Sequence, residues 1–127
     1  MLVEPRLGQG SFRIAVTKAY DEACAVTREH SLPALEAAHV RPYADGGAHA
    51  LPNGLLLRAD IHRLYDAGYV TVTPDYRFRV SGDLSDDFHN GREYERFAGR
   101  AITVPRAPAD RPNPELLEWH ATGVFRG

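Results

Sequence analysis

Three histidines and several polar side chains suited to metal binding or proton transfer gather in one segment of the chain. It covers residues 35–68, LEAAHVRPYADGGAHALPNGLLLRADIHRLYDAG. His39 lies in one apolar run, Asn53 opens a second, and His62 precedes Asp66 by four residues. On a helix, His62 and Asp66 would share one face and offer a ligand pair for a divalent cation. Taken alone, the spacing of these two residues favours a solvent-exposed hydrogen bond between them over a metal site.

Two short strands and a helix are predicted to position these side chains. Leu35, Ala37 and Val40 indicate a strand, which Pro42 and the sequence Asp45-Gly46-Gly47 end in a loop. The apolar run resumes over residues 51–57 as a second strand. Asp60 is then predicted to cap a helix over residues 61–67, which ends at Gly68.

Asn53 is the candidate for fixing the loop between the two strands. Its amide both donates and accepts hydrogen bonds, so it can tie the loop to the backbone and hold His39 in one orientation. A plain Asn53-Gly54 turn is the alternative interpretation. Both can hold together, because fixing the loop is how Asn53 would serve the site.

The rest of the chain is predicted to support this segment within one α+β domain covering residues 1–127. Residues 35–68 form its core motif and residues 83–127 a C-terminal supporting segment. The expected supporting elements are a helix over 11–22 capped by Ser11, a β-hairpin of 69–72 and 76–80, a helix over 91–98, a strand over 102–104, and a last helix over 114–121 in which Trp119 packs.

Cys24 is the only cysteine, so the chain forms no internal disulfide and no cysteine-based zinc site. It could act as a nucleophile with His30 as its base, but that needs an activated thiolate in a polar cleft. Its neighbours Ala23, Ala25 and Val26 favour a buried small apolar residue instead.

Composition indicates an ordinary soluble domain of 127 residues, with 43% hydrophobic and 25% charged residues. The net charge of -2 argues against a free-standing nucleic-acid binder, so attraction to DNA would need a local patch or another domain. Lys18 is the only lysine among 15 basic residues, and arginine suits bidentate phosphate contacts. No apolar run approaches about 20 residues, and the N-terminus lacks the apolar core of a secretion signal. We therefore expect a cytoplasmic protein without a membrane partner.

Residues 36–66 resemble the ββα-metal fold of HNH endonucleases, with His39, Asn53 and His62 as the three letters of the motif. LGQGSFR, CAVT, AAHVRPY, NGLLLRADIHRLYDAG and LLEWH resemble the HNH branch found at the C-terminus of restriction endonucleases, including modification-dependent ones. The resemblance covers nearly the whole chain. It implies a small α+β domain with a central ββα-metal motif, flanking helices and an extra β-hairpin.

The resemblance also implies a role for each motif residue. His39 would be the general base that takes a proton from the attacking water, and Asn53 would orient the loop. His62 and Asp66 would bind one divalent cation, which could be magnesium, manganese, nickel or zinc. Many HNH enzymes have a ligand directly before the base, where this chain has Ala38; Glu36 could replace it directly or through water.

DNA is the substrate that the resemblance implies. Arg41, Arg58, Arg63 and His49 are candidates for phosphate contacts, although each could equally be a solvated side chain. In the family, a separate domain often recognises the DNA sequence or modified base. One site per chain would cut both strands more easily in a homodimer. The expected activity is phosphodiester hydrolysis in the restriction of foreign or modified DNA.

Two other functions stay open at this point. Ala38 and the acidic charge balance are compatible with a catalytically weak or inactive HNH-like DNA-binding module. A stand-alone, toxin-type nuclease acting on DNA or RNA is the other alternative, which the lack of a basic composition disfavours.

Overall fold

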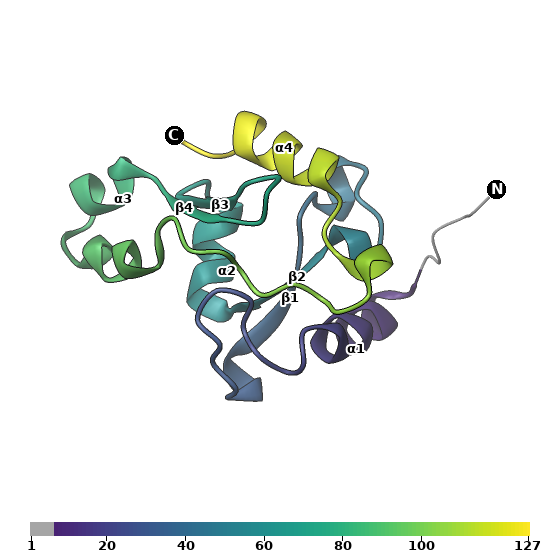
Figure 1. Cartoon of the computed structure of the whole chain (residues 1–127). Helices are drawn as coiled ribbons and strands as arrows, with labels where there is room; N and C mark the ends of the chain where they lie inside the picture. Colours follow the sequence, from purple (N-terminus) through teal and green to yellow (C-terminus); the bar gives the residue numbers. More distant parts are fainter. Residues whose placement is uncertain (1–6) are drawn as a thin grey trace.

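A two-stranded hairpin followed directly by a helix lies at the centre of the structure (Figure 1). Strand β1 (Leu35–His39) pairs antiparallel with β2 (Gly54–Arg58), and α2 (Ala59–Asp66) begins at the next residue. The computed structural model describes residues 7–127, so residues 1–6 of the predicted domain lie outside it. The β-β-α order predicted for residues 35–68 is confirmed.

Helices α1 (Gln9–Ala19) and α2 both pack against this hairpin. The three leucines of β2 are almost fully buried, which explains why the strand is apolar at consecutive positions rather than alternating. Gly54 allows the close approach of α1, because a Cβ atom there would lie 2.6 Å from Cγ2 of Val16. The hairpin that carries His39 is therefore held from both sides.

A second antiparallel hairpin and the C-terminal helix complete the core. Strand β3 (Val70–Val72) pairs with β4 (Phe78–Val80), as predicted, and α4 (Pro114–Gly123) packs on β3. Helix α3 (Gly82–Asp87) and the 3-10 helix η4 (His89–Phe97) lie at the opposite end of the molecule from α1 (Figure 1). The shorter 3-10 helices are η1 (Leu32–Ala34), η2 (Tyr43–Asp45), η3 (Leu51–Asn53) and η5 (Pro108–Asp110). The fold is thus α+β, as predicted.

Both predicted helix caps near the site are wrong. Helix α1 begins at Gln9 with Gly8 as its N-cap, two residues before Ser11. Helix α2 has Arg58 as its N-cap, and Asp60 lies inside the first turn. The Asp60 carboxylate is bound instead by Arg58, at 2.7 Å, and by the Tyr94 hydroxyl, at 2.6 Å. The neighbouring Arg58 and the distant Tyr94 together decide where Asp60 points.

The chain after β4 also departs from the predicted elements. Residues 102–104 form no strand, because the Ile102 amide donates to Tyr76 whereas the Thr103 amide donates to Ala25. Only an isolated bridge between Arg77 and Ala101 remains there. Residues 91–97 belong to a 3-10 rather than an α-helix, and α3 was not predicted. Among residues 7–127, no helix combines the length and apolar character that a membrane crossing requires.

Candidate active site

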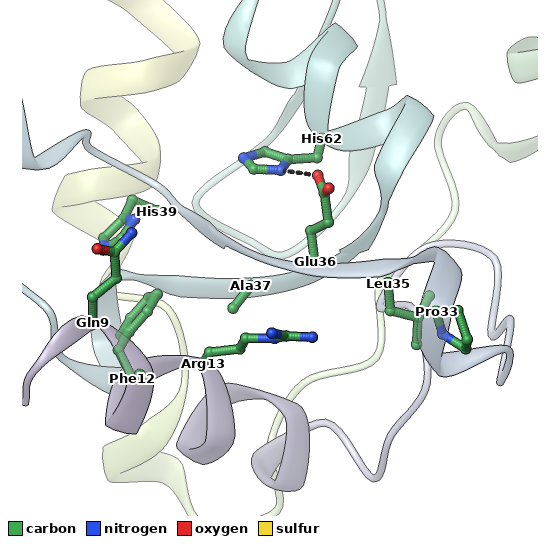
Figure 2. A pocket seen from close by; sticks show the side chains of 10 residues that line it. Gln9, Phe12, Arg13, Pro33, Leu35, Glu36, Ala37, His39 and His62 are labelled. Carbon is green, nitrogen blue, oxygen red and sulfur yellow. Dashed lines mark hydrogen bonds and ion pairs between the residues drawn. The ribbon is translucent and has the colours of Figure 1, made fainter.

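A cavity of about 720 Å³ lies where α1, β1 and α2 meet. His39 stands at the end of β1, whereas His62 faces the cavity from α2 (Figure 2). Both predicted histidines therefore line one cavity although they are 23 positions apart in the sequence. The lining residues are Gln9, Gly10, Phe12, Arg13, Pro33, Leu35, Glu36, Ala37, His39 and His62.

The ring of His62 lies between two carboxylates. Its Nδ1 atom is 2.7 Å from Oε1 of Glu36, the contact drawn in Figure 2. Its Nε2 atom is 3.2 Å from Oδ2 of Asp66. The hydrogen bond with Asp66, together with the weaker effect of Glu36, outweighs burial and raises the pKa of His62 above 6.5. The helical pairing predicted for His62 and Asp66 is thus present.

The donor set around His62 fits an open, partly hydrated cation site rather than a closed one. Among residues 7–127, no three His, Cys, Asp or Glu side chains converge in a metal-binding arrangement. Glu36 and Asp66 contact opposite nitrogens of one ring, so an ion at either nitrogen has one carboxylate beside it. Mg²⁺ typically takes one or two carboxylates, several waters and substrate phosphates. His62 and Asp66 can supply such a partial shell, but not the four protein ligands of structural zinc.

His39 is a half-buried ring packed against α1. Its ring stacks on Phe12 with a centroid distance of 4.2 Å and an interplanar angle of 10°. Burial first, and then the nearby His49 and His62, lower the pKa of His39 below its ordinary value of 6.5. The lowered pKa favours the neutral ring, which is the state in which imidazole can accept a proton.

Asn53 makes the hydrogen bonds that were expected of it. Its Oδ1 atom accepts from the Arg41 amide, and its Nδ2 atom donates to the carbonyls of Arg41 and Ala48, each at 2.9 Å. The side chain is 2% exposed, so water does not replace these bonds. Gly47 lets the loop close, because a Cβ there would lie 1.8 Å from the Arg41 carbonyl oxygen. The backbone immediately after His39 is thus fixed.

Part of the chain matches a known family in sequence, and most of it matches a solved structure in fold. Residues 24–73 match the sequence model of a family described as HNH endonuclease. Over these residues the chain is similar to HNH endonucleases. The matched segment contains β1, β2, α2 and β3, and within it lie His39, Asn53 and His62.

A solved structure described as "Modification dependent TagI restriction endonuclease" has a similar fold beyond the HNH segment. It superposes with a TM-score of 0.58 and 19% sequence identity over 87% of this chain. The chain spans about a third of that structure, covering 36% of its length. No curated protein matches the sequence.

The three arginines predicted near the HNH site do not line its cavity. Arg58 is paired with Asp60 at the end of the hairpin remote from His39. The Arg41 guanidinium lies 5.0 Å from the Trp119 ring centroid, which is the packing contact expected of that tryptophan. Arg63 is exposed on α2, next to His62.

Arg13 lines the HNH cavity and was not identified from the sequence. Its side chain extends from α1 alongside β1 (Figure 2). It also lines a neighbouring cavity of about 440 Å³ that contains Lys18. Among residues 7–127, no carboxylate lies within 4.0 Å of the Arg13 guanidinium. The sequence predicted only that Arg13 belongs to a helix that supports the motif.

Cys24 is outside the cavity and fully buried. Its Sγ atom accepts hydrogen bonds from the amides of Thr27, at 3.4 Å, and Arg58, at 3.3 Å. The interpretation of Cys24 as a buried small residue is confirmed, because the thiol joins a turn to the end of β2.

Proposed function

We propose that this domain hydrolyses phosphodiester bonds in DNA, with His39 as general base and one divalent cation bound by His62 and Asp66. The observation that carries the proposal is that a half-buried histidine, His39, and a histidine paired with carboxylates, His62, line the same cavity from different elements. The match to the HNH endonuclease family supports the same reaction.

His39 would accept a proton from the water that attacks phosphorus. The water oxygen then bonds to phosphorus while the bond to the leaving oxygen breaks, with the two oxygens in line. The depressed pKa of His39 keeps its ring available as a base at neutral pH. Stacking on Phe12 restricts the orientation of that ring.

His62 and Asp66 would hold the cation at the Nε2 side of the imidazole. The cation would neutralise charge on the phosphate and stabilise the leaving oxygen. We assign Glu36 to the opposite side, where it accepts a hydrogen bond from Nδ1 and leaves Nε2 free to coordinate. Glu36 would thus act on the ligand His62 rather than replace the acid missing at Ala38.

Substrate contacts are proposed on both sides of β1. Arg13 from α1 and Arg63 from α2 would bind phosphates that flank the scissile bond, since arginine forms bidentate contacts with phosphate. The named restriction endonuclease with a similar fold supports a role in restricting foreign or modified DNA. Because that structure is much longer, we propose that a separate domain recognises the DNA. Cleavage of both strands would then use a homodimer.

Plasmid nicking by the purified chain tests this proposal. Wild type and His39→Ala would be compared with magnesium, manganese, nickel or zinc and with EDTA, and His89→Ala, an exposed histidine of η4, is the matched control. We expect nicking that needs a divalent cation, is lost in His39→Ala and is retained in His89→Ala. Full activity in His39→Ala would refute the assignment of the base. Tight DNA binding without nicking under any metal would instead favour a binding module.

A further inference from the structure

His49 lies in the loop between β1 and β2 and contacts the proposed base directly. Its Nδ1 atom is 2.8 Å from Nε2 of His39, and the two ring centroids are 5.0 Å apart. Tyr43 stacks on the other side of the pair, with a centroid distance of 4.7 Å to His49 and an interplanar angle of 2°. Phe12, His39, His49 and Tyr43 thus form a continuous row of ring contacts, in which the two histidine rings are tilted by 59°.

The backbone on each side of His49 is fixed. The carbonyl of His49 accepts a hydrogen bond from the Leu7 amide at 2.8 Å, and the carbonyl of Ala48 accepts one from Asn53. Ala50 is buried. The contact with His39 is therefore made by a ring that both its backbone and its stacking partner hold in place.

This contact restricts which nitrogen of His39 can act as a base. Because Nε2 is engaged with His49, only Nδ1 can accept a proton from water. If Nε2 of His39 carries the proton and donates it to His49, Nδ1 keeps its lone pair. In the reverse arrangement, His49 donates and His39 carries its own proton on Nδ1, so His39 has no free lone pair.

We propose that His49 is a positioning residue that accepts a hydrogen bond from Nε2–H of His39 and thereby holds Nδ1 of the base ready for the attacking water. The proposal rests on the nuclease function and on His39 as its base. After the proton has moved from water to Nδ1, the same hydrogen bond becomes charge-assisted, because His39 is then an imidazolium. His49 would therefore favour the protonated base that forms during the reaction.

A positioning role for His49 and a phosphate contact by His49 predict different effects on the kinetics of DNA cleavage. A phosphate contact acts on DNA binding, so its loss raises KM and weakens the affinity for DNA. A positioning contact acts on the chemical step, so its loss lowers kcat and leaves KM nearly unchanged. The two roles are therefore separated by steady-state kinetics on one DNA substrate.

Two substitutions of His49 test the role of its Nδ1 atom as the hydrogen-bond acceptor. His49→Phe keeps a ring to stack on Tyr43 but removes the acceptor, whereas His49→Asn places an amide oxygen close to the position of Nδ1. We expect His49→Phe to lower kcat by about 10–100-fold, the range found when a partner that orients a metal-bound histidine is removed. His49→Asn should recover about tenfold of that loss, with KM within about twofold of wild type in both variants.

Full kcat in His49→Phe, a loss confined to KM, or equal kcat in the two folded variants would each overturn the proposal. The nitrogen chemical shifts of the histidine rings in the wild-type protein give a second measurement that needs no variant at position 49. We expect His39 protonated on Nε2 and unprotonated on Nδ1, with His39→Gln identifying its signals; the opposite tautomer would overturn the proposal. Absence of nicking by wild type would instead refute the nuclease function, and the ring tautomer would still be measurable.

Discussion

The Oδ2 atom of Asp66 lies 3.2 Å from Nε2 of His62, one helical turn earlier on α2. Two donor atoms at this separation can share one cation, and the helix fixes their spacing without any distant contact. Glu36 reaches the same ring from β1, on its other nitrogen. The His62–Asp66 pair on α2 and the Glu36 carboxylate on β1 therefore make separate contributions to the proposed cation binding, and each can be tested by substitution.

His62→Ala should weaken binding of Mn²⁺ by at least about tenfold, since it removes the nitrogen that lies beside Asp66. Titration calorimetry with the DNA-free protein measures this directly. His30→Ala, an exposed histidine outside the cavity, is the control and should bind Mn²⁺ as wild type does. An unchanged affinity in His62→Ala would remove this residue from the proposed ligands.

Glu36→Gln should weaken Mn²⁺ binding less than Glu36→Ala does. The amide oxygen of glutamine can still accept from Nδ1 of His62, whereas alanine leaves that nitrogen without its partner. We expect a loss of about 10–100-fold for Glu36→Ala in the same calorimetric titration. Equal losses in the two variants would indicate that the charge of Glu36, rather than its hydrogen bond, matters for the ion.

Asn53→Asp should destabilise the fold by at least about 2 kcal/mol, although the two side chains have nearly the same shape. The substitution replaces the Nδ2 donor with an oxygen that faces the carbonyls of Arg41 and Ala48. Urea denaturation of wild type and variant measures the difference. Asn113→Asp is a matched control, because among residues 7–127 the side chain of Asn113 accepts one hydrogen bond, from the Glu115 amide, and donates none; aspartate can accept the same bond. Equal stability of Asn53→Asp and wild type would contradict the role of Asn53 as a loop clamp.

The stability that His120 contributes should decrease as the pH falls below about 6.5. The ring is 2% exposed, bonded to the Thr71 hydroxyl at 2.7 Å and to the Tyr65 carbonyl at 2.8 Å, and stacked on Tyr65. Burial lowers its pKa in the folded state below 6.5, so the unfolded chain takes up the proton first. Stability is therefore complete above 6.5 and is lost as the pH falls toward the folded pKa.

The measurement is the free energy of unfolding of wild type and His120→Gln between pH 5 and 8. The advantage of wild type should shrink on acidification, by at most about 1.4 kcal/mol per pH unit for one proton. The lowered pKa of His39 also makes stability fall on acidification, whereas the raised pKa of His62 makes it rise. Both histidines are present in wild type and in His120→Gln, so their effects cancel in the difference between the two free energies of unfolding. A difference independent of pH would show that His120 does not titrate differently in the two states.

The order of elements around the site was predictable because local signals specify it. Apolar runs of strand length, the Gly-rich loop and the spacing of His62 and Asp66 determine the β-β-α sequence. The loop clamp by Asn53 was predictable as well, since an amide beside a glycine loop has backbone groups within reach. The His62–Asp66 pair lies on one element, and the Asn53 clamp closes a single loop between two predicted strands, although it joins residues 12 positions apart.

Contacts between elements were decided only by the tertiary structure. Arg13 reaches the cavity because α1 packs on the hairpin, and Tyr94 of η4 binds the Asp60 carboxylate that pairs with Arg58. The contact of His49 with His39 depends on how the loop folds back onto β1. Side chains meet across such distances according to how elements pack, and packing is determined by the whole core rather than by local residue spacing.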